Sequence, residues 1–118
     1  MIVLPWPDKG LSPNARLHWA KLAANKKQAR HDAHVLATLA LPLKARRDIA
    51  SSEGRIPILV RFYPPDARHR DDDNMVASFK AARDGIADAL GVDDRRFRPV
   101  YQFMGPEKPG RVEVEIGI

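Results

Sequence analysis

The sequence contains no cysteine, and this absence excludes several classes of structure and chemistry. Disulfide frameworks, cysteine-ligated zinc, iron–sulfur clusters and thiolate catalysis all require that residue. The chain also has no apolar run long enough to span a bilayer. Its first residues, Met1 to Trp6, lack the basic region and the apolar length of a signal peptide. We therefore expect a cytoplasmic protein with no membrane segment.

The charge is unbalanced toward the basic side. The chain has 118 residues, with 20 lysines and arginines against 15 acidic residues, so its formal net charge is +5. A basic excess on a small domain is typical of nucleic-acid binding, although many basic proteins bind none. The length suits a single domain covering residues 1–118.

Hydrophobic periodicity and turn residues predict an α+β fold in β-α-β-α-β-β order. The predicted strands are 2–6, 56–63, 100–104 and 112–116, and the predicted helices are 15–41 and 74–90. Pro57 indicates either that its strand lies at a sheet edge or that the strand starts near this proline. Ser12-Pro13 is a candidate helix start. Residues 44–54 are expected to form a surface connection with at most a loose helical turn. We expect a mixed sheet of about four strands packed by two main helices.

An acidic cluster, Asp71-Asp72-Asp73, stands directly before Asn74 and the clearest predicted helix. Adjacent carboxylates repel one another, so they are tolerated when solvated, at a helix N-terminus or around a cation. A second pair, Asp93-Asp94, follows the same helix. The spacing does not match an EF-hand, whereas two or three carboxylates with open positions are the magnesium pattern. The alternative is that the acids only cap the helix.

Basic residues flank both acidic groups. Carboxylates alone repel a polyanion, but carboxylates with a metal and surrounding arginines attract one. The alternative is mutual neutralisation in weak surface ion pairs. The flanking residues are Arg68, Arg70, Arg95, Arg96 and Arg98.

Lys80 lies seven positions after Asp73 and four before Asp84. In one continuous helix these three residues share a face. Lys80 and Asp84 then form either a plain ion pair, worth about 0.2–0.5 kcal/mol, or part of a phosphate-stabilising site. The spacing alone leaves both interpretations open.

These groups together resemble the RusA family of Holliday-junction resolvases, and the resemblance covers nearly the whole chain. The segments that carry it are Leu4-Pro5-Trp6-Pro7, Ser12-Pro13-Asn14-Ala15-Arg16, Arg70-Asp71-Asp72-Asp73-Asn74, Lys80-Ala81-Ala82-Arg83-Asp84, Val92-Asp93-Asp94-Arg95-Arg96 and Gly110-Arg111-Val112-Glu113-Val114. The resemblance implies a RusA-like fold and a homodimeric endodeoxyribonuclease that resolves four-way DNA junctions in recombination and repair. It implies Mg²⁺ as cofactor, with Mn²⁺ as a candidate substitute, and an association with phage or prophage. Paired symmetric nicks would leave 5′-phosphate and 3′-hydroxyl ends.

The resemblance also assigns residues. It implies that Asp71, Asp73 and Asp94 bind the metal and act in catalysis, and that Lys80 is the catalytic lysine. Five residues separate Asn74 from Lys80, about one helical turn more than in the family's best-known members, which shifts the lysine by about 5 Å. Asp84, Asp93 and Asn74 are second-layer candidates that would orient Lys80 or a metal-bound water. The candidate DNA-binding residues are Asn14, Arg16, Lys21, Arg68, Arg70, Arg95 and Arg96.

Two other functions fit the same residues. One is a metal-dependent nuclease that acts on flaps or nicked duplex, because junction selectivity depends on shape and not on a motif. The other is a non-catalytic basic DNA-binding module, in which the acids act only as caps. Any of these should bind DNA with strong salt dependence, through the candidate residues together with Lys9, Lys26 and Lys27.

Overall fold

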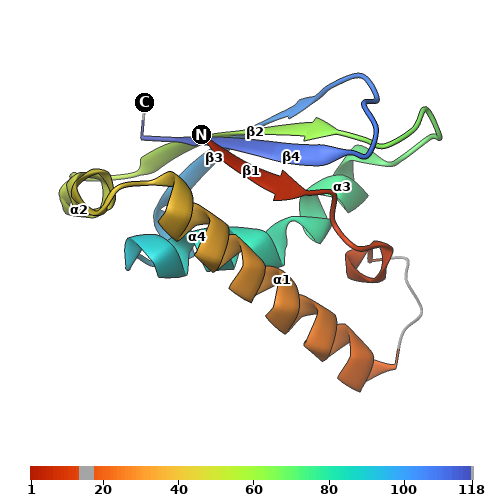
Figure 1. The fold of residues 1–118 in the computed structure, drawn as a ribbon, viewed down its shortest axis with the longest axis horizontal. Coiled ribbons are helices and arrows are strands. Elements are labelled where there is room, and N and C mark those ends of the chain that lie inside the picture. Colours follow the sequence, from red (N-terminus) through yellow and green to blue (C-terminus); the bar gives the residue numbers. More distant parts are fainter. Residues whose placement is uncertain (14–17, 118) are drawn as a thin grey trace.

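The computed structural model describes residues 1–13 and 18–117, in which helices cover one face of a mixed four-stranded sheet (Figure 1). The strands are β1 (Ile2–Pro5), β2 (Ile56–Tyr63), β3 (Phe97–Phe103) and β4 (Arg111–Ile116). The helices are α1 (Trp19–Ala40), α2 (Leu43–Ser51), α3 (Asp72–Ser78) and α4 (Lys80–Leu90), with 3₁₀ turns η1 (Lys9–Leu11) and η2 (Asp94–Arg96). The predicted α+β class and mixed sheet are confirmed.

The strand order in the sheet is β1-β4-β2-β3. Strand β4 is antiparallel to both β1 and β2, whereas β2 and β3 are parallel and are connected through α3 and α4. Strand β2 therefore lies inside the sheet, so the predicted edge position is wrong. The alternative, that Pro57 lies at the start of its strand, is confirmed. The missing N–H does little harm at this second position, and the Pro57 carbonyl accepts a 2.9 Å hydrogen bond from Gly117 N.

The core lies between the sheet and the helices. Alternate residues of β2, from Ile56 to Phe62, point into it and are buried, as the period of two in a strand requires. Phe62 is the centre of an aromatic cluster, because other rings surround it with centroid distances between 5.5 and 6.2 Å. These rings are Trp6, Phe79, Tyr101 and Phe103. Phe62 and Phe79 are fully buried, which is worth about 1.5–3 kcal/mol for each side chain.

Helices α1 and α4 pack closely through small residues. Ala33, Ala37 and Gly85 are buried between them, and a Cβ atom on Gly85 would lie 2.1 Å from the Arg30 carbonyl oxygen. The predicted start of the first helix at Ser12-Pro13 is wrong, because Ser12 ends η1 and α1 begins at Trp19. His18 caps α1 by accepting a 3.3 Å hydrogen bond from Ala20 N.

The predicted helix over 74–90 begins two residues earlier and is interrupted at Phe79. The Phe79 ring is buried and packs edge-on against Phe62 and Tyr101. Its N–H donates to the Val76 carbonyl three residues back (3.2 Å), as in a tightened turn. Lys80 and Asp84 share a face of α4, as predicted, because Lys80 Nζ donates to Asp84 Oδ1 at 2.7 Å. Asp73 lies on the separate helix α3, so the predicted continuous helix that would carry all three residues is not formed.

The segment after α1 is more ordered than the sequence suggested. Residues Leu43–Ser51 form a nine-residue helix, α2, where we expected a connection with a loose turn. The segment has neither glycine nor proline, and leucine, lysine, alanine and arginine all favour helix. Strand β3 also begins at Phe97, three residues before the prediction. No helix in residues 1–13 and 18–117 has the length and apolarity needed to cross a membrane.

Candidate active site and nucleic-acid interface

A cluster of four charged side chains, Lys80, Arg83, Asp84 and Asp94, lies along α4 and η2; we call it the Lys80 cluster. Lys80 Nζ donates to Asp84 Oδ1 at 2.7 Å and to Asp94 Oδ2. Arg83 Nη2 donates to the Asp94 carbonyl at 3.1 Å. The chain returns along α4 because Gly91 adopts a left-handed conformation with φ of 69°. Lys80 and Asp94, which the motif resemblance named separately, are thus in contact.

The two carboxylates keep Lys80 charged. Partial burial acts to lower the pKa of the Lys80 ammonium, but hydrogen bonds and charges from Asp84 and Asp94 outweigh it and raise the pKa above its usual value. The Lys80 side chain is 56% exposed, while each of the two carboxylates is 25% exposed. Lys80 is therefore cationic at neutral pH, and its side chain is more than half exposed to solvent.

A second ion pair connects this region to α1. Arg30 donates from Nε and Nη2 to the two carboxylate oxygens of Asp88 at 2.7 and 2.8 Å. The hydrogen bond from Arg30 lowers the pKa of the Asp88 carboxyl. Arg30 and Asp88 line a groove of about 340 Å³ together with Lys80, Asp84 and Asp94. The pair therefore holds α1 against the helix that carries Lys80.

A larger groove of about 820 Å³ runs between α1 and the α3–α4 junction; we call it the basic groove. Its acidic lining in the described residues is Asp84 alone, against five cationic side chains. These are Lys26, Lys27, Arg30, Lys80 and Arg83. Asp88, Asp84 and Asp94 pair with Arg30, Lys80 and Arg83, so the excess positive charge comes mainly from Lys26 and Lys27. A groove with an excess of positive charge attracts phosphates.

The predicted metal ligands do not form one group. Asp71, Asp72 and Asp73 are exposed at the N-terminus of α3, where Asp71 Oδ1 accepts a 3.0 Å hydrogen bond from Asp73 N. Asp94 instead faces Lys80. Among residues 1–13 and 18–117, no three histidine or acidic side chains converge closely enough to hold a metal ion. The described carboxylates thus form no group of three around one point, and ligation of Mg²⁺ by Asp71, Asp73 and Asp94 stays a prediction.

The candidate DNA-binding residues before α4 differ in availability. Asn14 and Arg16 lie outside the described residues. Lys21 on α1 and Arg68 before α3 are exposed. Arg70 is already engaged, because it pairs with Asp66 at 2.9 Å and lies over the ring of Trp6 at 5.5 Å.

The candidates after α4 are also held by neighbours. Arg95 pairs with Asp93 at 3.0 Å, and its hydrogen bonds lower the pKa of the Asp93 carboxyl to about 2. Arg96 donates to the carbonyls of Ala50, Ser52 and Gly54, at 2.6 to 3.2 Å, and so fixes the end of α2. Its contacts indicate a structural role.

Among the second-layer candidates, Asp84 contacts Lys80, whereas Asp93 contacts Arg95. Asn74 is half-buried on α3 and takes part in neither of these contacts. Sequence reasoning did not single out Arg30, Arg83 or Asp88. Arg30 and Asp88 are 58 positions apart, so no local pattern could pair them. Asp88 does follow Asp84 by four residues, which places both on one face of α4.

Comparison with known proteins gives little functional information. No family model matches this chain. A protein of Xylella fastidiosa (strain Temecula1 / ATCC 700964), described only as uncharacterized, is 51% identical over 102 residues. The match covers 81% of this chain and 61% of the relative's length. The chain thus spans less than two thirds of that relative.

Proposed function

We propose that this protein is a Mg²⁺-dependent endodeoxyribonuclease of the RusA type that resolves four-way DNA junctions as a homodimer. The observation that carries the proposal is the contact of Lys80 with Asp94 beside the basic groove. The motif resemblance selected these two residues, 14 positions apart, from sequence alone. The α+β fold with its mixed sheet is compatible with the proposal.

The basic groove would hold the DNA backbone. Lys26 and Lys27 on α1 are exposed and face the same groove as Lys80. Contacts of this kind position a phosphate without reading sequence. Binding through them is expected to weaken steeply with salt, because each phosphate contact releases bound counterions.

Lys80 would stabilise the reacting phosphate. An ammonium aimed at a phosphate that gains charge in the transition state contributes about 10²–10³-fold to a rate. Asp84 and Asp94 hold the ammonium and keep it protonated. Asp84 therefore acts as a positioning residue for Lys80.

Magnesium enters the proposal through the motif resemblance. The described carboxylates do not converge on one point, so no chemical step is assigned to the ion. The dimer enters because paired cuts on opposed strands need two sites related by a two-fold axis. Both parts of the proposal have direct tests.

The test uses a synthetic four-way junction, a matched duplex and a flap, each with and without Mg²⁺ or Mn²⁺. The proposal expects paired, ligatable cuts in the junction, lost in Asp73→Asn and reduced about 10²–10³-fold in Lys80→Ala. Lys44→Ala on α2 is the matched control and should cut normally. Junction binding should persist in Lys80→Ala, and size-exclusion chromatography with light scattering should show a dimer. Magnesium-dependent cutting of every substrate would keep the nuclease and refute the junction selectivity.

The non-catalytic DNA-binding module is the second candidate, and the dispersed carboxylates favour it. It expects junction binding that ignores magnesium, survives Asp73→Asn and leads to no cleavage with either metal. Lys80 would then be a structural partner of Asp84 and Asp94. In that case, Lys80→Ala should lower stability, and neither this variant nor the wild type should cut DNA.

A further inference from the structure

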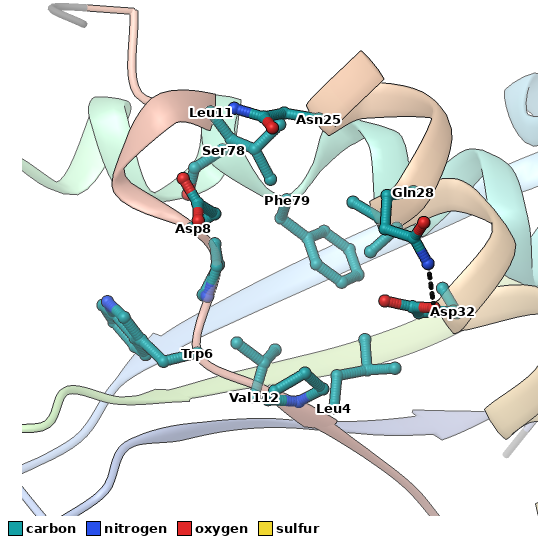
Figure 2. Close-up of a pocket in the computed structure, with 15 residues that line it drawn as sticks. Leu4, Trp6, Asp8, Leu11, Asn25, Gln28, Asp32, Ser78, Phe79 and Val112 are labelled. Atoms are coloured by element: carbon teal, nitrogen blue, oxygen red, sulfur yellow. Dashed lines mark hydrogen bonds between the residues drawn. The ribbon is translucent and has the colours of Figure 1, made fainter. Parts of the chain in front are cut away.

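A pocket of about 280 Å³ opens beside the basic groove, between β1, α1 and the α3–α4 junction (Figure 2). Phe79 forms its back wall, and Leu4 and Val112 lie below. Trp6 closes one side and Leu11 lies above. Small-molecule sites are typically about 300–1,000 Å³, so this one suits a single ring system.

The rim of the pocket carries polar groups that face one another. Figure 2 shows Asp8 on one side and Gln28 with Asp32 on the other. Gln28 Nε2 donates to Asp32 Oδ1 at 2.8 Å, and the second carboxylate oxygen of Asp32 points toward the centre of the pocket. Within the described part of the chain, the amide of Asn25 makes no hydrogen bond. The rim can therefore accept hydrogen bonds from a ligand.

The charge of the pocket is opposite to that of its neighbour. Asp8 and Asp32 are its charged lining residues, and no lysine, arginine or histidine lines it among the described residues. The adjoining basic groove has five cations and shares Leu11, Ser78 and Phe79 with the pocket. An anionic group is thus repelled from the pocket and attracted to the groove, a few side chains away.

We propose that this pocket binds an unpaired nucleobase that carries an exocyclic amino group, while its phosphate lies in the basic groove. The inference rests on the proposed function, because it supplies the nucleic-acid ligand. Trp6 is half-buried at the side of the pocket and offers aromatic surface for the ring, and stacking on such side chains is a general means of holding unpaired bases. Asp32 accepts from the amino group, as acidic side chains do from cytosine, and Asn25 and Gln28 supply amide groups. Adenine, cytosine and guanine have such an amino group and thymine does not.

The charge pattern favours a nucleotide over an arginine side chain from another protein. A guanidinium would pair with Asp8 and Asp32, but it would reach the pocket beside five cations of the groove. A nucleotide places each part on complementary charge, since its base is neutral and its phosphate anionic. The pocket would thus sort the bases at an unpaired position next to Lys80.

The experiment titrates the four deoxynucleoside 5′-monophosphates into the ¹⁵N-labelled protein without divalent metal, and follows the indole N–H of Trp6 and the amides of Asn25 and Gln28. The proposal expects the adenine, cytosine and guanine nucleotides to shift these signals and to bind about tenfold more tightly than the thymine nucleotide. Asp32→Asn should weaken the amino-bearing nucleotides by about the same factor and leave the thymine nucleotide unchanged. Ala29→Leu, which fills the pocket, should abolish the shifts for all four. Asp48→Asn on α2 removes the same charge elsewhere and should bind normally.

Equal binding of all four nucleotides, or an unchanged affinity in Asp32→Asn, would overturn the proposal. Shifts at these signals with methylguanidinium and none with nucleotides would overturn it in favour of a protein's arginine. Magnesium-dependent junction cleavage with no nucleotide in the pocket would refute the pocket alone. Selective nucleotide binding without cleavage of any DNA would support the pocket and refute the nuclease.

Discussion

Replacing Gly85 by alanine tests how α1 is held against the helix that carries Lys80. Alanine favours an α-helix over glycine by about 1 kcal/mol, so propensity alone predicts a more stable protein. The structure predicts the reverse, because the new Cβ would lie 2.1 Å from the Arg30 carbonyl oxygen and 3.0 Å from the Ala33 Cβ. The opposing oxygen belongs to the backbone of α1, so a rotamer change cannot relieve the overlap.

The two effects can be weighed. Overpacking of a well-packed core costs about 1–3 kcal/mol, and a backbone neighbour places Gly85 at the upper end. After the gain in propensity, the free energy of unfolding should fall by about 2 kcal/mol. For a chain of this length that corresponds to a fall in Tm of about 8 °C. The shift of α1 should also weaken DNA binding in the basic groove.

The assay is urea and thermal unfolding followed by circular dichroism. Gly105→Ala is the control for the substitution itself, since a Cβ there meets nothing within 4 Å and stability should be unchanged or slightly higher. Ala24→Gly, at an exposed position of α1, calibrates the propensity term and should cost about 1 kcal/mol. A Tm for Gly85→Ala at or above that of the wild type would refute the proposed close contact between α1 and α4.

Three further predictions follow from individual contacts. Asp88→Asn should lower the urea midpoint at pH 7, because Arg30 lowers the pKa of Asp88 below its usual value of 3.8. The difference in stability between wild type and variant should have its full size above the usual pKa of Asp88. It should disappear as the pH falls through the lowered pKa of the folded state. Urea unfolding at several pH values measures this difference. Arg96→Ala should lower the free energy of unfolding by about 1–2 kcal/mol in urea unfolding, because it leaves the carbonyls at the end of α2 without their donor. Lys27→Gln should weaken junction binding and reduce the slope of log K against log salt by about 0.9, as measured by fluorescence anisotropy.

Each of these predictions has a control and a contradicting result. An Asp48→Asn substitution should change stability little at any pH, and a deficit in Asp88→Asn that persists in acid would contradict the ion-pair explanation. Arg96→Lys keeps the charge but not the fork of donors, so it should resemble Arg96→Ala. Full stability of Arg96→Lys would show that charge alone suffices. Lys44→Gln should leave the salt slope unchanged, and an equal fall there would mean that binding follows net charge and not the groove.

The sequence alone determined the elements whose pattern is local. Alternating Val112, Val114 and Ile116 predicts a half-buried strand, and Gly91 marks the end of a helix, because side-chain period and left-handed backbone are properties of neighbouring residues. The α+β class and the mixed sheet followed from the same signals. The motif residues Lys80 and Asp94 were also identified before their positions in space were known.

The tertiary structure decided what depends on contacts between distant segments. The helix is interrupted at Phe79, with no glycine or proline there, because that ring packs against Phe62 and Tyr101. The central place of β2 depends on its pairing with both β3 and β4, and Pro57 permitted either position. Arg96 could be either a DNA ligand or a structural anchor until its carbonyl partners, more than 40 residues away, were known.

The candidate site divides in the same way. Composition and motif predicted a basic protein with acidic groups and a lysine at stated positions. Only packing of α1 on α4 brings Lys26 and Lys27 to the same groove as Lys80, and only the fold places Asp8 and Asp32 around one pocket. Residues separated by tens of positions share a site when the core closes between them, because long-range burial, and not local preference, sets the distance between elements.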